Sequence, residues 1–303
     1  MDSILLTFFN KSLANPINDV LMASLSMSAY IALPGMGLYL YWRSNRQLGM
    51  TVLFAVFAVV ILTLLVQLFA QRPRPEDIRL LFSQPQFPAY PSGHAAAAFA
   101  AAAVTSLSLP GLRLTFWVFS SAVLISLSRM YLGFHYFSDL FGGAVLGAAV
   151  GAAFFGFMMT QSTGARKWRW LLWPQVAVVI ILTQMTYLNL PPNHTFTFEH
   201  TDKIMHFLLF GAVAFWLNIW LEGRRKLLFR RNIPIAILLP FTIAIVEETL
   251  QFFSPYRTLS AADLLSDLTG MLFFWWLSEK LLTRWKKAAF ADKAAKELES
   301  VSG

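Results

Sequence analysis

The chain has 303 residues, of which 57% are hydrophobic and only 13% are charged. Soluble domains carry about 25% charged residues, so this composition excludes an ordinary soluble domain and predicts an integral membrane protein. The net charge is +8, but the basic residues lie mainly between apolar runs, which favours an anionic membrane surface over nucleic acid as the partner. The sequence has no cysteine, which excludes disulfides, thiolate metal sites and a cysteine nucleophile.

The N-terminal stretch 1–13 predicts a short interfacial helix. Leu5, Leu6, Phe8 and Phe9 supply its apolar face. A cleavable signal peptide is not expected, because the stretch has no basic n-region and no A-x-A-like site follows it.

Apolar runs predict a polytopic, all-α membrane protein of about nine transmembrane helices. The expected spans are 20–42, 49–70, 93–109, 113–128, 136–159, 170–188, 204–222, 233–252 and 263–281. The runs lack the alternation of strands, and only helices or closed barrels span lipid. The third span is rich in alanine and the fifth in glycine, so these two should pack closely in the middle of a bundle.

The polar segment 160–169 is the predicted boundary between two bundles of five and four helices. It is a cytoplasmic linker between a domain over 1–159 and a second over 170–281. The basic cytoplasmic tail 282–303 is either a helix on the inner leaflet or a frayed, solvated end.

The distribution of Lys and Arg predicts the orientation of the chain. With the N-terminus outside, seventeen of these residues lie on the cytoplasmic side and seven on the outer side. Cytoplasmic segments carry an excess of positive charge, so the N-terminus is expected outside and the C-terminus inside. The sequence makes no prediction of oligomeric state.

Three polar clusters in the first half fall at the outer ends of predicted helices. They are Gln67 to Pro75 after the second span, Pro91 to His94 before the third, and Ser128 to Asp139 between the fourth and fifth. Because the membrane holds helix ends at a common depth, these distant segments should meet on one face.

The side chains in these clusters suit phosphate binding. Arg74 and Arg129 can each donate two hydrogen bonds to phosphate oxygens. Ser92 and the backbone N–H groups of Gly93 and His94 lie at a predicted helix N-terminus, which is a natural anion site. A single interfacial Arg or His usually only snorkels toward headgroups, but the whole set at these spacings favours a site.

The same clusters contain the groups for covalent catalysis. His135 and Asp139 are four residues apart and are expected on one helical face, where the carboxylate can orient the imidazole. His135 is therefore the candidate nucleophile. His94 is the candidate general acid, which then activates water as a base.

These motifs resemble the type 2 phosphatidic acid phosphatase superfamily, whose pattern is K-x6-R-P, P-S-G-H and S-R-x5-H-x3-D. The resemblance covers residues 1–159. It implies a helical core, a metal-independent reaction without cofactor and a phosphohistidine intermediate. It implies the same site residues, which are Arg74, Ser92, Gly93, His94, Arg129, His135 and Asp139. The five-span layout resembles bacterial undecaprenyl pyrophosphate phosphatases of that superfamily.

One position departs from the superfamily pattern, because Gln67 stands where the lysine is expected. Glutamine keeps a donor but loses the charge. We hypothesise that Arg72, in the run Arg72-Pro73-Arg74-Pro75, compensates by binding phosphate. The alternative is that Arg72 faces lipid headgroups.

A second polar cluster is expected at the outer end of the second half. Its members are Asp202, His206, Glu248, Gln251, Arg257, Asp263 and Asp267. Ionisable groups at membrane depth are costly, which favours a functional role. The spacing of these residues resembles the VanZ-like family.

Three interpretations of this second cluster are open. It can bind a lipid or cell-wall intermediate for the phosphatase. It can be a separate catalytic or metal site, although no metal ligand set is assigned. It can also consist of buried ion pairs that fix helix packing.

The sequence thus predicts a lipid phosphatase of the bacterial cytoplasmic membrane with an outward-facing site, with a membrane lipid as its partner. Undecaprenyl pyrophosphate is the favoured substrate. Phosphatidic acid, phosphatidylglycerol phosphate and lipid A are alternatives, as is phosphoryl transfer to another lipid. A resistance or transport protein with an inactive phosphatase domain is the alternative outside the enzymes.

Overall fold

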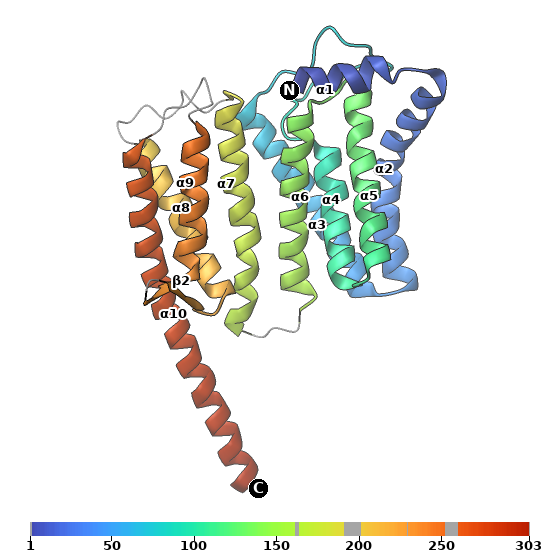
Figure 1. The fold of residues 1–303 in the computed structure, drawn as a ribbon. Helices are drawn as coiled ribbons and strands as arrows, with labels where there is room; N and C mark the ends of the chain where they lie inside the picture. Colours follow the sequence, from blue (N-terminus) through green and yellow to red (C-terminus); the bar gives the residue numbers. More distant parts are fainter. Residues whose placement is uncertain (1, 161–163, 191–200, 229, 252–259, 303) are drawn as a thin grey trace. The chain divides into compact units, whose positions relative to one another are not determined.

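The computed structural model describes residues 2–160, 164–190, 201–228, 230–251 and 260–302, and it is almost entirely helical (Figure 1). The first half contains α1 (Asp2–Thr7), a π-helical turn (Phe8–Ser12), α2 (Pro16–Arg43), α3 (Arg46–Ala70), α4 (Gly93–Ser108), α5 (Leu112–Tyr131) and α6 (Phe137–Met158). The second half contains a 3-10 helix (Gly164–Leu171), α7 (Leu172–Tyr187), α8 (Thr201–Trp220), β1 (Arg225–Leu228), β2 (Arg231–Pro234), α9 (Ile235–Gln251) and α10 (Ala261–Ser302).

The chain forms two compact units. Unit 1 comprises Met1–Gln161 and Val176–Thr195, and unit 2 comprises Ser162–Gln175 and Phe196–Gly303. Unit 1 thus takes in α7 from Val176 onward as well as the five helices expected in the first bundle. The predicted domain limits at 159 and 170 and the 5 + 4 grouping stay predictions.

Six of the described helical segments are long and apolar enough to cross a membrane, namely α2, α3, α5, α6, α8 and the segment Lys167–Tyr187, which joins part of the 3-10 helix to α7. α4 is apolar but shorter. The run 233–252 forms the 17-residue α9 after a strand, and the run 263–281 is the start of the 42-residue α10. The helical fold is therefore confirmed, whereas the count of nine spans is not.

One small sheet departs from the all-helical prediction. Strands β1 and β2 pair antiparallel, with Arg225 opposite Pro234 and Leu228 opposite Arg231. The first two residues of each strand are basic or polar and lie exposed, so the hairpin belongs to a polar connection between apolar helices. The apolar-run criterion does not detect a two-stranded turn of this kind.

Local signals explain where the first helices begin and end. The Asn15 side chain accepts a hydrogen bond from the Asn18 N–H at 2.9 Å and caps α2, and the Asn45 side chain caps α3 in the same way at 3.0 Å from the Leu48 N–H. α3 ends at Ala70 and is capped by Gln71, whose φ of 43° is left-handed, and Pro73 follows two residues later. The chain therefore leaves α3 directly into the loop that carries Arg72 and Arg74.

Helices α4 and α6 pack with almost no side chain between them. A Cβ added at Gly147 would collide with the backbone carbonyl oxygen of Ala96, and one added at Gly151 would lie 2.5 Å from the carbonyl oxygen of Ala100. Close approach through small residues is how helices associate in lipid. The prediction that the alanine-rich and glycine-rich segments pack together is confirmed.

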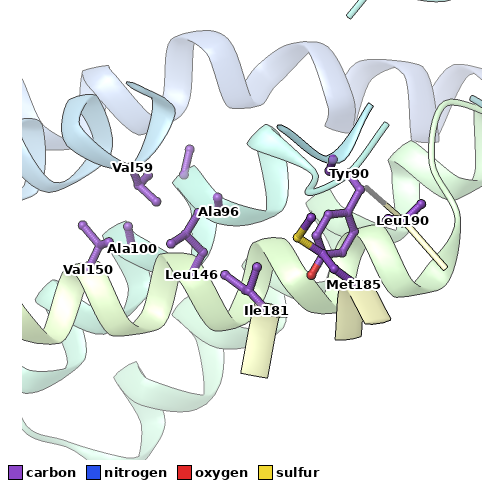
Figure 2. Packing of buried hydrophobic residues seen from close by; sticks show 11 residues of the cluster. Val59, Tyr90, Ala96, Ala100, Leu146, Val150, Ile181, Met185 and Leu190 are labelled. Carbon is purple, nitrogen blue, oxygen red and sulfur yellow. The ribbon is translucent and has the colours of Figure 1, made fainter. Parts of the chain in front are cut away.

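Buried apolar side chains join four helices of unit 1. Figure 2 shows part of this cluster, which includes Val59 of α3, Ala96 and Ala100 of α4, Leu146 and Val150 of α6, and Ile181 and Met185 of α7. By contrast, large apolar side chains of α2 lie exposed, with Ile17 at 80% and Ile31 at 79%. A dry interior with an apolar exterior is the pattern expected of helices in lipid.

In unit 2 the closest packing is between α8 and α10. A Cβ added at Gly270 would collide with the carbonyl oxygen of Phe207. The fully buried Asn218 donates to the Ser278 hydroxyl at 2.9 Å and to Glu279 at 3.1 Å. α10 runs without a break to Ser302, so the predicted tail helix is the direct continuation of the last apolar run.

Candidate active site

The three polar clusters of the first half meet at one end of unit 1. They lie at the C-terminal end of α3, the N-terminal end of α4, and the junction of α5 and α6, on the same side as α1 (Figure 1). A direct hydrogen bond joins two of them, because the Ser92 N–H donates to the carbonyl oxygen of Asp139 at 2.9 Å. The antiparallel course of the helices therefore brings motifs distant in sequence to one place.

His135 and Asp139 form the centre of this site. The imidazole Nδ1 lies 3.5 Å from Asp139 Oδ2, and the two side chains are 3% and 0% exposed. α6 begins at Phe137, so His135 lies just before the helix and not on the helical face that the spacing suggested. The Asp139 carboxylate turns back to cap the helix and accepts from the Tyr136 N–H at 2.8 Å, which is why it reaches His135.

The surroundings keep His135 neutral. Burial lowers the pKa of His135 below the usual range of an imidazole; Asp139 opposes this shift, and the positive charges of Arg74 and Arg129 add to it. A neutral imidazole has a free lone pair, as a nucleophile requires. Since Nδ1 faces Asp139, Nε2 is the ring nitrogen available for attack.

The P-S-G-H motif begins α4. Ser92 is the N-cap residue and is fully buried, and Gly93 opens the helix. The His94 ring packs edge-to-face on Tyr30 of α2, with 4.6 Å between ring centroids. His94 lies near enough to Arg129, His135 and Arg74 for their charges to act on its imidazole. The first N–H groups of the helix lack intrahelical acceptors and suit an anion at this end.

Several polar atoms of the site make no hydrogen bond within the described residues. They are Ser92 Oγ, His94 Nε2 and Arg129 Nε, all of them buried. His135 Nδ1 also makes no hydrogen bond but faces Asp139 at 3.5 Å. Buried polar groups are normally paired, and groups that are not often belong to functional sites. Their common location is what a site for a phosphate group requires.

Arg74 and Arg129 are held by neutral groups. Arg74 donates to the carbonyl oxygens of Phe87 at 2.8 Å and Phe134 at 2.6 Å. Arg129 donates to the Ser26 hydroxyl at 2.6 Å, and its guanidinium lies 4.5 Å from the centre of the Phe134 ring. In the described part of the chain neither guanidinium has a carboxylate within ion-pair distance, although the charge of Asp139 acts on Arg74 from further away.

Three residues that contact side chains of this site were not identified from the sequence motifs. Tyr30, Ser26 and Phe134 touch His94 or Arg129 but belong to no phosphate-binding pattern. Tyr30 and Ser26 come from α2, which the sequence identifies only as an apolar span. Only the proximity of α2 to α4 and α5 reveals them.

Gln67 and Arg72 have different environments. The Gln67 amide is buried and donates to the carbonyl oxygen of Pro91 at 2.9 Å, so it supports the turn before Ser92. Arg72 donates to Asp139 Oδ1 at 2.5 Å and to Asp2 Oδ2 at 2.9 Å. This double ion pair corresponds neither to the phosphate contact nor to the headgroup contact expected for Arg72.

The second polar cluster lies in unit 2 and links α8 to α10. His206 Nδ1 lies 3.0 Å from Asp267 Oδ1, and Lys203 Nζ lies 2.8 Å from Asp202 and 3.7 Å from Asp263. The pairs His206–Asp267 and Lys203–Asp263 cross from α8 to α10 and support the interpretation in which the cluster fixes helix packing.

The remaining members of this second cluster lie on α9 and beyond it. Gln251 donates to Glu248 at 3.0 Å, and both are buried. Arg257 lies outside the described residues. Among the residues that are described, no group of three or more His, Asp or Glu side chains is arranged to hold a metal ion.

Known proteins match both halves of the chain. Residues 48–163 match the PAP2 superfamily, and residues 144–282 match VanZ/LLP1. An undecaprenyl-diphosphatase of Sulfolobus acidocaldarius is 28% identical over 144 residues, which are 46% of this chain and 67% of that protein. The crystal structure of Aquifex aeolicus LpxE is similar to 51% of this chain and 94% of its own, with 27% identity and a TM-score of 0.45.

The family match and the relative indicate a multi-pass membrane lipid phosphatase. Residues 48–163 are similar to the PAP2 superfamily, and the VanZ/LLP1 match over residues 144–282 overlaps the end of that range. Both resemblances seen in the motifs are thereby confirmed.

Proposed function

We propose that the protein hydrolyses a lipid diphosphate or phosphate through a phosphohistidine on His135, with a polyprenyl diphosphate as the favoured substrate. The observation that carries the proposal is the convergence of His94, His135, Arg74 and Arg129 at one end of unit 1. The undecaprenyl-diphosphatase relative supports the choice of substrate.

The first step of the proposed reaction transfers the phosphoryl group to the enzyme. Nε2 of His135 attacks the terminal phosphorus, an N–P bond forms, and the P–O bond to the lipid leaving group breaks. His94 donates a proton to the leaving oxygen. Arg74, Arg129 and the N–H groups at the start of α4 stabilise the negative charge on the transferred group.

The second step releases inorganic phosphate. His94, now neutral, takes a proton from a water molecule that attacks phosphorus, and the N–P bond to His135 breaks. Asp139 stabilises the positive charge that His135 carries while it is phosphorylated. His94 and His135 regain their starting protonation states, and no metal or cofactor takes part in this sequence of steps.

A substrate panel on the purified full-length protein tests this proposal. Phosphate release is measured in detergent for undecaprenyl diphosphate, phosphatidic acid, phosphatidylglycerol phosphate and lipid A. The highest kcat/KM is expected for undecaprenyl diphosphate, with activity unchanged by chelator. Higher kcat/KM for another lipid would reassign the substrate, and inhibition by chelator that added metal reverses would contradict the mechanism.

We further propose that the site faces outward from a bacterial cytoplasmic membrane, with the C-terminus in the cytoplasm. The excess of Lys and Arg at the opposite ends of the spans supports this orientation. An outward site suits a lipid carrier whose diphosphate is exposed outside after its cargo is transferred.

The absence of cysteine makes this orientation easy to measure. A cysteine at Ser83, in the exposed loop beside the site, should react with a membrane-impermeant thiol reagent in intact cells. A cysteine at Ser44, exposed at the other end of unit 1, should react only after the membrane is permeabilised. The reverse pattern of labelling would place the site on the cytoplasmic side.

A further inference from the structure

The guanidinium of Arg72 makes a set of polar contacts that the proposed reaction does not yet use. It donates from one nitrogen to Asp139 Oδ1 at 2.5 Å and to the Ser138 hydroxyl at 2.6 Å. From a second nitrogen it donates to Asp2 at 2.9 Å. Its guanidinium carbon also lies over the Tyr136 ring, 4.3 Å from the ring centre, which is a cation–π contact.

These contacts divide the two oxygens of Asp139 between different partners. Oδ1 accepts from Arg72, whereas Oδ2 accepts from the Tyr136 N–H and faces His135. A carboxylate held at both oxygens cannot rotate. Arg72 therefore fixes the angle at which Asp139 meets the imidazole.

Asp2 holds Arg72 in place from the other side. Its carboxylate accepts from Arg72, from the Ser138 N–H at 3.1 Å and from the Ser138 hydroxyl. The side chains become less exposed along this chain of contacts, from 23% for Asp2 to 11% for Arg72 and 0% for Asp139. The N-terminal helix α1 is thus connected to the catalytic histidine through three consecutive polar contacts.

We propose that Arg72 is a positioning residue that orients Asp139 toward His135, and that Asp2 of α1 completes the site by anchoring Arg72. This inference rests on the proposed function, since it assigns a role within that reaction. It also replaces the idea that Arg72 binds the phosphate group, because its donors face carboxylates of the protein.

The positive charge of Arg72 should also affect the pKa of His135. The groups around His135 are Asp139 on α6, Arg129 on α5, His94 on α4, and Arg74, Arg72 and Tyr136 in the loops. Asp139 is the one described anion in this set, and Arg72 offsets its charge. Without Arg72, Asp139 stabilises the imidazolium more strongly, and the pKa of His135 rises.

The test compares Arg72→Gln, Arg72→Lys and Asp2→Asn with the matched control Arg79→Gln. Arg79 lies in the same loop, pairs with a carboxylate (Asp19, at 2.7 Å) and lies over a tyrosine ring (Tyr131, at 5.4 Å), but it does not contact Asp139. The kinetic readout is kcat and KM for undecaprenyl diphosphate as a function of pH.

Arg72→Gln should lower kcat by about 10- to 100-fold with little change in KM, because misplaced catalytic groups slow the chemical step. The acid limb of its kcat/KM profile should move to higher pH by about one unit. Arg72→Lys should keep part of the wild-type kcat and most of the wild-type pH profile. Asp2→Asn should show a smaller fall in kcat and a smaller shift of the acid limb than Arg72→Gln. Arg79→Gln should keep the wild-type pH profile.

A second readout does not depend on turnover. The sequence has five histidines, so ¹⁵N-histidine NMR in detergent can follow His135, assigned by the signal that disappears in His135→Gln. His135 should titrate at higher pH in Arg72→Gln than in wild type and Arg79→Gln. An unchanged titration, or a variant that raises KM and leaves kcat and the pH profile alone, would overturn the positioning role. Absence of phosphate release by wild type would instead refute the proposed function. The NMR titration of His135 would still test the role of Arg72 in that case.

Discussion

Replacing His135 by alanine should abolish turnover, with kcat reduced by at least about 10⁴-fold. The residue is a buried imidazole beside Asp139, and burial lowers its pKa, which favours the neutral form that a nucleophile needs. Loss of the nucleophile removes the covalent route entirely, which costs more than the loss of any one phosphate contact.

The intermediate provides the decisive measurement. Wild type quenched during turnover of ³²P-labelled lipid should carry acid-labile, base-stable label, and His135→Ala should carry none. Helix content and elution volume in detergent should match wild type, which separates lost chemistry from lost folding. Acid-labile label on the alanine variant would reassign the nucleophile.

The second histidine gives an internal comparison for this result. His94→Gln should still form the phosphoenzyme from a substrate with a good leaving group, because such a group departs without a proton. Turnover should fall by about 10²- to 10⁴-fold for poor leaving groups. Equal losses for both kinds of substrate would mean that His94 does not act as the general acid.

Replacing Gly147 by alanine should have the largest effect on the fold of unit 1. The added methyl group would collide with the backbone carbonyl oxygen of Ala96, and backbone cannot rotate out of the way as a side chain can. Overpacking of this kind costs about 3 kcal/mol. If the protein still folds, α4 must move away from α6 and carry His94 away from His135, and a shift of about 1 Å can reduce kcat by about 10²-fold.

A matched glycine makes this test specific. Gly35 lies within α2, and a Cβ added there would meet no atom within 4 Å. Gly35→Ala should therefore keep wild-type thermal stability and kcat, whereas Gly147→Ala should lose both. Equal behaviour of the two variants would contradict the close packing of α4 and α6.

The sequence predicts the helical membrane fold, the pairing of α4 with α6, and the residues of the phosphatase motifs. It does so because lipid imposes strong rules: long apolar runs become helices, and small residues mark close contacts. The structure of short polar connections between helices is predicted less well. The hairpin at Arg225–Leu228 and Arg231–Pro234 is absent from the sequence-based prediction because nothing in an apolar-run pattern encodes it.

Partners of charged side chains are the other part that the sequence leaves open. Arg72 was expected to meet phosphate or headgroups, but it meets Asp139, which follows 67 positions later, and Asp2, which precedes it by 70. Likewise, His135 shares no helix with Asp139, since α6 begins after it. An ion pair depends on which helix ends become neighbours, and spacing along the chain does not contain that information.

The sequence alone supplies the residue types suited to phosphate chemistry and the expectation that helix ends gather them at one depth. The fold adds their partners: among the described residues Arg74 and Arg129 are held by neutral groups, whereas Arg72 pairs with two carboxylates. A guanidinium binds whichever acceptors the folded chain places within about 3 Å of it. That neighbourhood is created by the packing of α1, α3, α5 and α6 and by no single segment of the sequence.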